Sequence, residues 1–480
     1  MISVRSAHAR LTASLLLAGA CLSACMVGPD YHRPAVATPP QFKEAEGWTP
    51  AVPADSIDKG AWWSVFDDPV LDGLERRVEI SNQTLAAAEA AYREAHAIVA
   101  EDRAQLFPTI GLTGSASGSG SGKGSGSKTS SGTTTHQYQV AGDAAWAPDL
   151  WGKIRRTIEA AHANAVASAA DVANARLSAQ SELATDYFEL RMTDADKALL
   201  QDTVAADQRS LTVTENKYKV GVVARSDVLT AQTQLDAVRA QLVDLDRQRT
   251  AAEHAIAVLV GQPPADLTIE PVSGWSPGAP ATPIQVPSTL LQRRPDVAAA
   301  ERSAAAANAQ VGVAVAAYYP NLNLSAEGGF ASAALDTLFR SSSSFWSLGA
   351  DVSETVIDFG ARHAAVQQAK AAYDEAVAQY RETVLTAFQN VEDALAAARV
   401  LQNEQPLLER EAQDATDNVS ISLNEYKAGT VDFTTVAAAQ ASALSAQESL
   451  TNLRAARMTE AVDLIQALGG GWSDSDLKGK

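Results

Sequence analysis

The sequence predicts a mainly α-helical chain with a membrane β-barrel, built by internal duplication, and three observations point to this fold class. A phrase that begins at Asn216 returns at Asn424, so that Tyr218 and Tyr426 stand 208 positions apart. In each copy, short segments of alternating apolar and polar residues come first, and a very long stretch with helical spacing follows. A duplication has to be recognised first, because missing it changes the predicted fold of the whole chain.

The first residues predict a secreted lipoprotein. Residues 1–24 combine a basic start with an apolar core that is too short to span a bilayer as a helix. The tetrapeptide at residues 22–25 resembles a bacterial lipobox, in which the sulfur of Cys25 takes a diacylglycerol and Cys25 becomes the first mature residue. An ordinary secretory signal that is cut nearby is the alternative. Because Met26 follows Cys25, in place of an aspartate that would retain the protein at the inner membrane, the resemblance implies sorting to the outer membrane.

Composition excludes several classes of protein. The formal net charge is −19, which argues against a nucleic-acid binder. Cys21 leaves with the signal and Cys25 is acylated, so the mature chain has no cysteine pair for a disulfide. After residue 24 no stretch reaches the roughly 18 apolar residues of a transmembrane helix. We therefore expect any membrane crossing to be made by a closed β-barrel.

The repeat extends beyond its opening phrase. Pro108 and Pro320 are 212 positions apart, whereas Gly152 and Gly360 are 208 apart. The first copy is therefore longer by four residues between these landmarks, within a Gly/Ser-rich stretch at residues 114–135. Such a composition cannot bury a core, and it predicts a flexible loop.

Either side of each loop, the residues alternate in the way that membrane strands do. In the first copy Tyr138, Val140 and Trp146 fall on one parity, and Gln139 and Asp143 fall on the other. A half-buried sheet of a soluble domain is the alternative. Two such hairpins give four strands, whereas a spanning barrel needs at least about eight. Several chains must then share one barrel, and residue patterns alone allow two chains or three.

Long helices follow each hairpin, and we expect them over residues 153–217 and 362–426. Sixty-five residues in a helix span roughly 98 Å. Pro406 should interrupt or kink the second helix. The helices after Asp227 and after Thr435 return antiparallel and end at glycines. Alanine and serine dominate these helices, which suits a thin wall that is wet on both sides.

Five motifs together resemble the TolC-type outer membrane factors, specifically the lipid-anchored branch that serves tripartite (RND-type) efflux systems. The resemblance covers nearly the whole mature chain. The motifs occur at residues 27–34 (VGPDYHRP), 62–74 (WWSVFDDPVLDGL), 149–156 (DLWGKIRR), 290–301 (LLQRRPDVAAAE) and 467–472 (ALGGGW).

This resemblance implies a homotrimer in the outer membrane of a Gram-negative bacterium. Each chain would give four strands to a twelve-stranded β-barrel, which a long periplasmic α-helical barrel continues. The resemblance also implies a passive exit duct for drugs or other small toxic compounds. Its partners would be outer-membrane lipid, a periplasmic adaptor (membrane fusion) protein and an inner-membrane transporter, expected to be of the RND type.

The expected organisation has six parts. They are residues 1–24 (lipoprotein signal peptide), 25–80 (N-terminal segment packing on the equatorial region), 81–261 (first repeat), 262–289 (equatorial linker), 290–472 (second repeat) and 473–480 (C-terminal tail).

The resemblance also assigns roles to the repeated turns. The residues that match the turns meeting the adaptor tip are Val220, Gly221, Val222, Ala428, Gly429 and Thr430. Asp227 matches the acid that ties the closed gate, and Tyr426 matches its aromatic hydroxyl partner. Ser226 and Asp227 are also good helix N-caps, and glycine in a helical hairpin is ordinary turn chemistry.

The chain departs from the family pattern at the second turn. Thr435 and Ala438 stand where many members carry carboxylates that constrict the pore, and Val431 stands where a cation is often found. Arg225 in the first turn and Asp432 in the second are the charged residues that we expect to contribute to the gate instead.

Other chemistry finds little support. The glycine-rich stretch lacks the Lys-Ser/Thr ending of a phosphate loop, and the histidines show no metal-binding spacing. We expect no enzyme activity, no metal and no cofactor apart from the covalent lipid on Cys25. Two alternatives stay open: the same channel serving protein or polysaccharide export, and a lipid-anchored envelope tether without a pore.

Overall fold

The computed structural model describes residues 26–45, 61–120, 134–278, 280, 293–470 and 472. Cys25 and the predicted signal peptide lie outside these residues. The chain divides into two compact units, each assembled from separate segments of the sequence. The first unit contains residues up to 34, 93–167 and 300–379, and the second contains 35–92, 168–299 and 380 onward.

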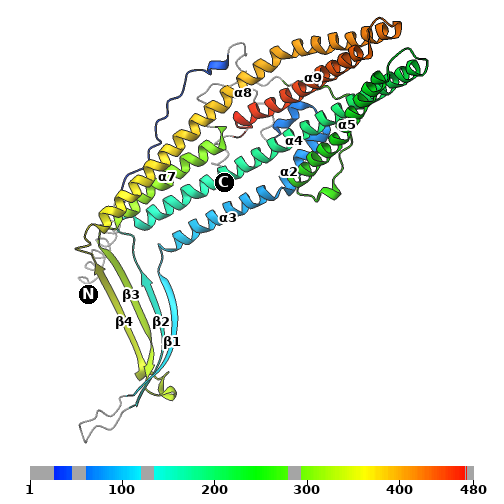
Figure 1. Ribbon diagram of the computed structural model, residues 1–480. Helices are drawn as coiled ribbons and strands as arrows, with labels where there is room; N and C mark the ends of the chain where they lie inside the picture. Colours follow the sequence, from blue (N-terminus) through cyan, green and yellow to red (C-terminus); the bar gives the residue numbers. More distant parts are fainter. Residues whose placement is uncertain are drawn as a thin grey trace. The chain divides into compact units, whose positions relative to one another are not determined.

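The first unit holds an antiparallel sheet of four strands in the order β1-β2-β3-β4, visible at the lower end of Figure 1. The strands are β1 (Thr109–Gly120), β2 (Thr134–Trp146), β3 (Asn321–Ser332) and β4 (Ser344–Ser353). Two short 3-10 turns, η4 (Leu335–Thr337) and η5 (Ser341–Ser343), connect β3 to β4. Each half of the duplicated sequence therefore contributes one hairpin.

Part of the Gly/Ser-rich stretch is strand, which corrects the prediction of a loop over all of residues 114–135. Gly114 pairs with Val140 and Gly120 pairs with Thr134. The ladder is made by backbone groups, and β2 supplies a partner with strand-forming side chains. The remainder of the predicted loop, residues 121–133, lies outside the described residues.

The register of the sheet separates two faces. Ile110 pairs with Ala144, which pairs with Ala326, which in turn pairs with Leu348. One row further, Leu112 lies in register with Trp346 through two glycines. The four large side chains of these two rows, Ile110, Leu112, Trp346 and Leu348, are 76 to 83% exposed in the single chain. Because successive residues of a strand point to opposite faces, Asp143 and its cross-strand partner Glu327 lie on the other, polar face.

The segment at residues 27–31 is fixed to the helices of the first unit. The Arg156 side chain is 1% exposed, and its guanidinium donates to the carbonyls of Val27 and Gly28 and to the Asp30 carboxylate. The Tyr31 hydroxyl donates to the Glu301 carboxylate at 2.6 Å. Residues 27–31 thus pack as part of the folded unit.

The helices of the repeat pass from one unit into the other. They are α3 (Gln83–Ala104), α4 (Lys153–Lys219), α7 (Pro295–Ala316) and α8 (Ala361–Ala428). The return helices α5 (Arg225–Leu259) and α9 (Phe433–Ala467) belong to the second unit. Among the helices that the structure describes, none is both long enough and apolar enough to cross a membrane.

Of the two predicted effects of Pro406, an interruption or a kink, the interruption is wrong, because α8 is continuous through Pro406. Proline removes one backbone hydrogen bond, the one to the carbonyl four residues earlier. Pro406 and Gln402 are both exposed, so water can solvate the orphaned carbonyl. The loss is small beside the remaining hydrogen bonds of a 68-residue helix.

The second unit has its main core where the N-terminal segment meets the repeat helices. Here α2 (Pro69–Ser81) and the 3-10 turn η2 (Trp62–Phe66) pack against α4, α5 and α9. Two further 3-10 turns lie in this unit, η1 (Lys43–Ala45) and η3 (Pro264–Asp266). The buried core residues include Trp62, Leu183, Ile256, Leu267 and Val462.

A buried ion cluster attaches the segment after η3 to the helices. Asp194, fully buried, accepts from Arg191 at 3.1 Å and from Arg249 at 2.7 Å. Arg191 also donates to the Glu270 carbonyl, and Arg249 donates to the Ile269 carbonyl. The cluster gives partners to both guanidinium groups and holds this linker on the helices.

Candidate functional site

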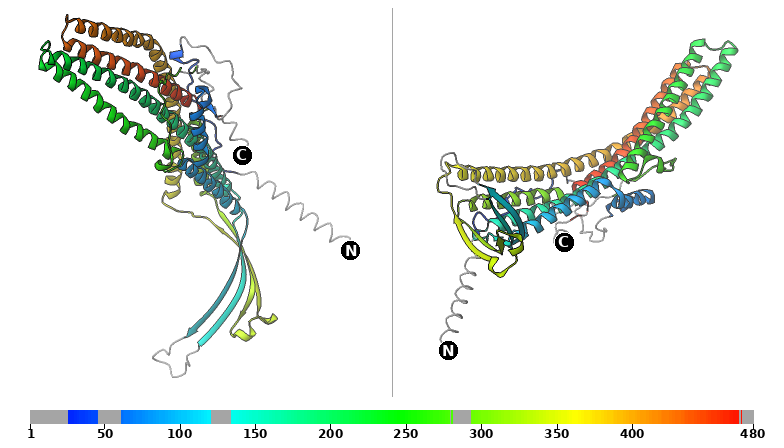
Figure 2. Two further views of the ribbon diagram at one scale, coloured as in Figure 1. Left: turned by 90° about the vertical axis from the view of Figure 1, so that its right-hand side faces the viewer. Right: turned by 90° about the horizontal axis from the view of Figure 1, so that it is seen from below.

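The two repeated turns have the same backbone design, and they lie beside each other at one end of the second unit (Figures 1 and 2). Gly221 has φ 78° and Gly429 has φ 79°. The amides of Gly221 and Val222 donate to the carbonyls of Tyr218 and Lys217, each at 2.9 Å. This pair of bonds is a Schellman motif, which closes a helix with a left-handed residue.

The second turn repeats this pattern one copy later. Gly429 donates to the Tyr426 carbonyl at 3.2 Å, and Thr430 donates to the Glu425 carbonyl at 3.0 Å. A Cβ added to Gly221 or Gly429 would meet nothing within 4 Å. Glycine is therefore required at these positions by the positive φ and not by crowding.

The helices that leave the two turns begin differently. The N-cap of α5 is Ala224, which makes no side-chain cap bond, so Ser226 and Asp227 are the second and third helical residues. The prediction that they serve as N-caps is therefore wrong. In α9 the N-cap is Asp432, whose Oδ1 accepts from the Thr435 amide at 3.1 Å.

The Asp432 carboxylate is engaged at its own helix end. Its Oδ1 also accepts from the hydroxyls of Thr434 at 2.6 Å and Thr435 at 3.0 Å. These bonds, with Thr434 contributing most, lower the pKa of Asp432. Asp432 is an exposed, ionised cap, and its use in the gate stays a prediction.

The two copies of the tyrosine lie in different environments. Tyr426 is 2% exposed, whereas Tyr218 is 45% exposed. The Tyr426 ring packs edge-on against Phe433 at 5.4 Å between centroids. Around these rings lie the buried side chains of Leu211, Ala231, Leu235 and Val436.

The Tyr426 hydroxyl donates to the Thr214 hydroxyl at 3.2 Å. The expected hydrogen bond to Asp227 is thus replaced within the chain by one to α4. Burial is the main cause that raises the pKa of Tyr426, the Thr214 bond opposes it, and the negative charge of Asp227 adds to it. Asp227 is half-buried and acts on Tyr426 electrostatically.

A row of polar contacts joins α4 to the second hairpin. We call it the polar seam and define it as Ser210, Thr214 and Lys217 of α4 with their partners Tyr426 and Gln440. Gln440 Nε2 donates to the Ser210 hydroxyl at 3.2 Å. The Lys217 ammonium donates to the Tyr426 carbonyl and lies 4.0 Å from the centroid of its ring. The seam joins the first hairpin to the second.

Sequence reasoning did not select Thr214 or Lys217. A signal was present, because residues i, i+4 and i+7 share one helical face and place Ser210, Thr214 and Lys217 in a row. A comparison of the two copies does not reveal this row, because the counterpart of Lys217, 208 positions later, is Glu425. The partners come from α8 and α9, and no local pattern pairs them.

One carboxylate at the inner end of the seam is buried. Asp207, three residues before Ser210 on α4, is 2% exposed. Neither of its oxygens has a hydrogen-bond partner among the described residues. Burial raises the pKa of Asp207 to about 6.

The remaining predicted residues of the turns are exposed. Val220 is 73% exposed and Val222 is 66% exposed. Arg225, the first residue of α5, and Thr430 are exposed as well. Val431 instead packs partly buried against the apolar residues around Tyr426. The turns therefore present valines and one arginine outward, and they bury the tyrosine.

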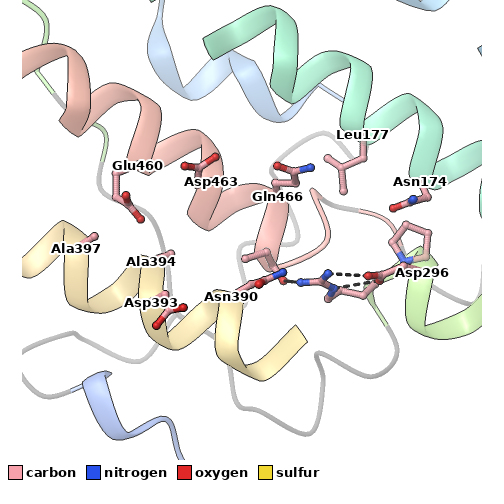
Figure 3. A pocket seen from close by; sticks show the side chains of 13 residues that line it. Asn174, Leu177, Asp296, Asn390, Asp393, Ala394, Ala397, Glu460, Asp463 and Gln466 are labelled. Atoms are coloured by element: carbon pink, nitrogen blue, oxygen red, sulfur yellow. Dashed lines mark hydrogen bonds and ion pairs between the residues drawn. The ribbon is translucent and has the colours of Figure 1, made fainter. Parts of the chain in front are cut away.

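A second polar region lies in a cavity of about 430 Å³ between α4, α7, α8 and α9 (Figure 3). Asp393, Glu460 and Asp463 line it, and an Arg294 guanidinium is bound to Asp296 at one side. Burial, followed by the charges of Asp463 and Asp393, raises the pKa of Glu460 to about 7. Within the described residues no group of three or more His, Cys, Asp or Glu is arranged to hold a metal ion.

Comparison with known proteins connects this arrangement to a family of channels. The family model described as outer membrane efflux protein matches residues 75–262 and 286–470. The pyoverdine export outer membrane protein OpmQ of Pseudomonas aeruginosa is 30% identical over 471 residues, covering 97% of this chain and 98% of OpmQ. The toluene efflux pump outer membrane protein TtgC of Pseudomonas putida is 29% identical over 464 residues, covering 96% of this chain and 95% of TtgC.

The fold is shared with solved structures as well. The CmeC outer membrane channel of Campylobacter jejuni superposes with a TM-score of 0.87 at 25% identity, covering 94% of this chain and 96% of CmeC. The family model covers both copies of the repeat, including the strands of the sheet and the two glycine turns.

Proposed function

Because the chain belongs to the outer membrane efflux protein family, we propose that it forms the exit duct of a tripartite efflux pump. Members of this family are outer-membrane efflux channels of Gram-negative bacteria, and they are not enzymes. The chain is accordingly an outer-membrane efflux channel. The finer proposal is a passive duct for small toxic compounds that works when docked to a periplasmic adaptor and an inner-membrane transporter of the RND type.

The exposed apolar face of the sheet is the observation that carries the membrane part of this proposal. Ile110, Leu112, Trp346, Leu348 and Val352 are each at least two-thirds exposed. A face of this kind is typical of strands that contact lipid. Removing such apolar surface from water lowers the free energy by about 25 cal/mol per Å².

The order of the sheet supports assembly from several chains. β1 and β4 are its two edges, and an unpaired edge leaves a row of backbone donors and acceptors without partners. In lipid these groups have to be paired. In our proposal three chains join edge to edge into one twelve-stranded barrel, and Cys25 carries the lipid that anchors each chain.

The two glycine turns are proposed as the docking end of the duct. Their outward side chains, Val220 and Val222, are apolar and exposed, which suits burial against the tip of an adaptor protein. The names of the relatives differ in cargo, one being a toluene efflux protein and another a pyoverdine export protein. We therefore place the choice of cargo in the transporter.

The docking proposal is tested by replacing both glycines with tryptophan. At φ near 80° a side chain is strained, and an indole on each turn obstructs the approach of a partner. Gly221→Trp with Gly429→Trp should abolish efflux of a toxic compound in cells that depend on this protein, with normal abundance in the outer membrane.

The matched control is Gly274→Trp, because Gly274 also has a positive φ with open space around it and lies outside the turns. This variant should leave efflux unchanged. Normal crosslinking of the double tryptophan variant to the adaptor, or normal efflux, would contradict docking at the turns.

A further inference from the structure

We propose that Lys217 is a positioning residue that latches the second glycine turn onto the first and so keeps the duct closed. The inference rests on the proposed function, because it assigns a closed state to the turn end of the duct. It concerns contacts within one chain.

Lys217 takes part in both turns at once. Its own carbonyl accepts the Val222 amide at 2.9 Å, which closes the first turn. Its ammonium donates to the Tyr426 carbonyl, which also accepts the Gly429 amide that closes the second turn. Lys217 is therefore bonded to both turns, and a movement of one turn relative to the other strains the bonds that it makes.

The chemistry of the contact makes it strong for a single side chain. A hydrogen bond from a charged donor is shorter and stronger than one from a neutral donor. The ammonium also lies over the Tyr426 ring, 4.0 Å from its centroid, within the range of a cation–π interaction. The carbonyls at the end of α8 carry the negative end of the helix dipole, which further favours a cation there.

The latch is made once per chain despite the duplication. The counterpart of Lys217 is Glu425, which cannot donate to the first turn, and Tyr218, the counterpart of Tyr426, is 45% exposed. The donor of this contact thus lies on the first hairpin and its acceptor on the second. Movement of the second hairpin away from the first has to break it.

Two neighbouring contacts of the polar seam assist the latch. The Tyr426 hydroxyl is held by Thr214, and Gln440 is bound to Ser210 one helical turn further from the tip. Of the three α4 residues of the seam, Lys217 lies nearest the turn, and it is the only charged residue of the seam as defined above. We infer that opening begins with Lys217 and proceeds along the seam.

The test compares Lys217→Met with Lys219→Met in the purified full-length protein. Methionine keeps an unbranched stem but removes the ammonium, and Lys219 is exposed two residues later at the end of α4. Hydrogen exchange followed by mass spectrometry reports the turn, and single-channel recording in a planar bilayer reports the duct.

We expect amide exchange in residues 426–433 to become faster in Lys217→Met and to stay unchanged in Lys219→Met. The open probability should rise about tenfold in Lys217→Met, which corresponds to about 1.4 kcal/mol. Lys217→Arg, which keeps the charge, should restore most of the closed state.

A cysteine pair gives a control inside the same molecule. Ser210→Cys with Gln440→Cys places two thiols at positions whose present side chains are hydrogen-bonded to each other. Because cysteine is shorter than glutamine, the two thiols are joined with a short bifunctional thiol reagent, and this crosslink in the Lys217→Met background should return the open probability toward that of the unchanged protein.

Three results would overturn the latch. They are unchanged exchange in residues 426–433 of Lys217→Met, faster exchange without a change in open probability, and an equal response in Lys219→Met. Failure of the proposed function looks different. In that case no variant conducts, while the exchange of residues 426–433 still responds to Lys217→Met.

Discussion

At the residue scale, one pair of tyrosines shows how the duplicated sequence acquires two roles. Tyr218 and Tyr426 occupy equivalent positions, but only Tyr426 faces a hydroxyl and an ammonium from the other hairpin. Their surroundings, not their own chemistry, make Tyr426 a buried contact between hairpins and leave Tyr218 exposed. A residue matched by resemblance can thus have a different partner from the one that the resemblance implies, as Tyr426 does in bonding Thr214.

Asp207 gives a pH-dependent prediction at the same scale. Its pKa in the folded chain is about 6, above the usual range for an aspartate, because the carboxyl is buried. The folded state therefore holds a proton that the unfolded state has lost. The contribution of Asp207 to stability is therefore greatest below the unfolded pKa near 4, falls as the pH rises to about 6, and is constant above it.

Asp207→Asn should remove this dependence. We expect the variant to unfold at a higher temperature than the unchanged protein at pH 7.5, and the difference to shrink as the pH approaches 4. Thermal unfolding of the purified protein across this pH range measures it, with Asp202→Asn, an exposed position on the same helix, as the control. A difference that stays constant with pH would show that Asp207 does not titrate in this way.

At the element scale, four glycines end helices with the same backbone conformation for two different reasons. Gly221 and Gly429 at the tips have open space around them. Gly261 and Gly469 end the return helices. A Cβ on Gly261 would lie 2.1 Å from the backbone oxygen of Ser81, and a Cβ on Gly469 would lie 2.1 Å from that of Arg293. The return ends therefore need glycine for conformation and for close approach.

This difference predicts unequal costs for the same substitution. Gly429→Ala should cost about 1 to 2 kcal/mol, the penalty of a left-handed residue with a Cβ. Gly469→Ala should cost about 1 to 3 kcal/mol more, because the backbone around Arg293 has to move. Denaturant unfolding of the two variants compares them, and equal destabilisation would contradict the close approach at Arg293.

Most elements could be predicted from the sequence, and the exceptions have physical reasons. Helical spacing predicted long helices that agree with α4 and α8 to within two residues at each end. The predicted break at Pro406 failed because one missing hydrogen bond on an exposed face is a minor loss for so long a helix. The predicted cap at Asp227 failed because α5 begins two residues earlier, at Arg225.

The site was harder to predict than the elements. The glycine turns follow from local sequence, because a Schellman turn depends on one residue with positive φ. Thr214 and Lys217 act through Tyr426, more than 200 positions away, so their pairing depends on how the hairpins pack. No spacing within one helix contains that information.

At the scale of the whole molecule, the fold class predicted from the residue patterns and the family predicted from the five motifs are confirmed. The sheet has an exposed apolar face, and the turn end has buried contacts between hairpins. The trimer, the adaptor and the gate stay proposals, because they concern copies and partners beyond one chain. Together these features support a duct that is inserted in lipid at its strands and closed at its turns.

The most direct test of a gated duct is the single-channel conductance of the purified, acylated protein in a planar bilayer, beside Asp227→Ala. The half-buried Asp227 carboxylate acts on Tyr426, and the variant removes that charge from the turn end. We predict a small, mostly closed conductance that rises severalfold in Asp227→Ala and stays unchanged in Asp236→Ala, an exposed position on the same helix. A wide conductance that is equal in all three proteins would contradict closure at the turns, and no conductance from any of them would contradict the duct itself.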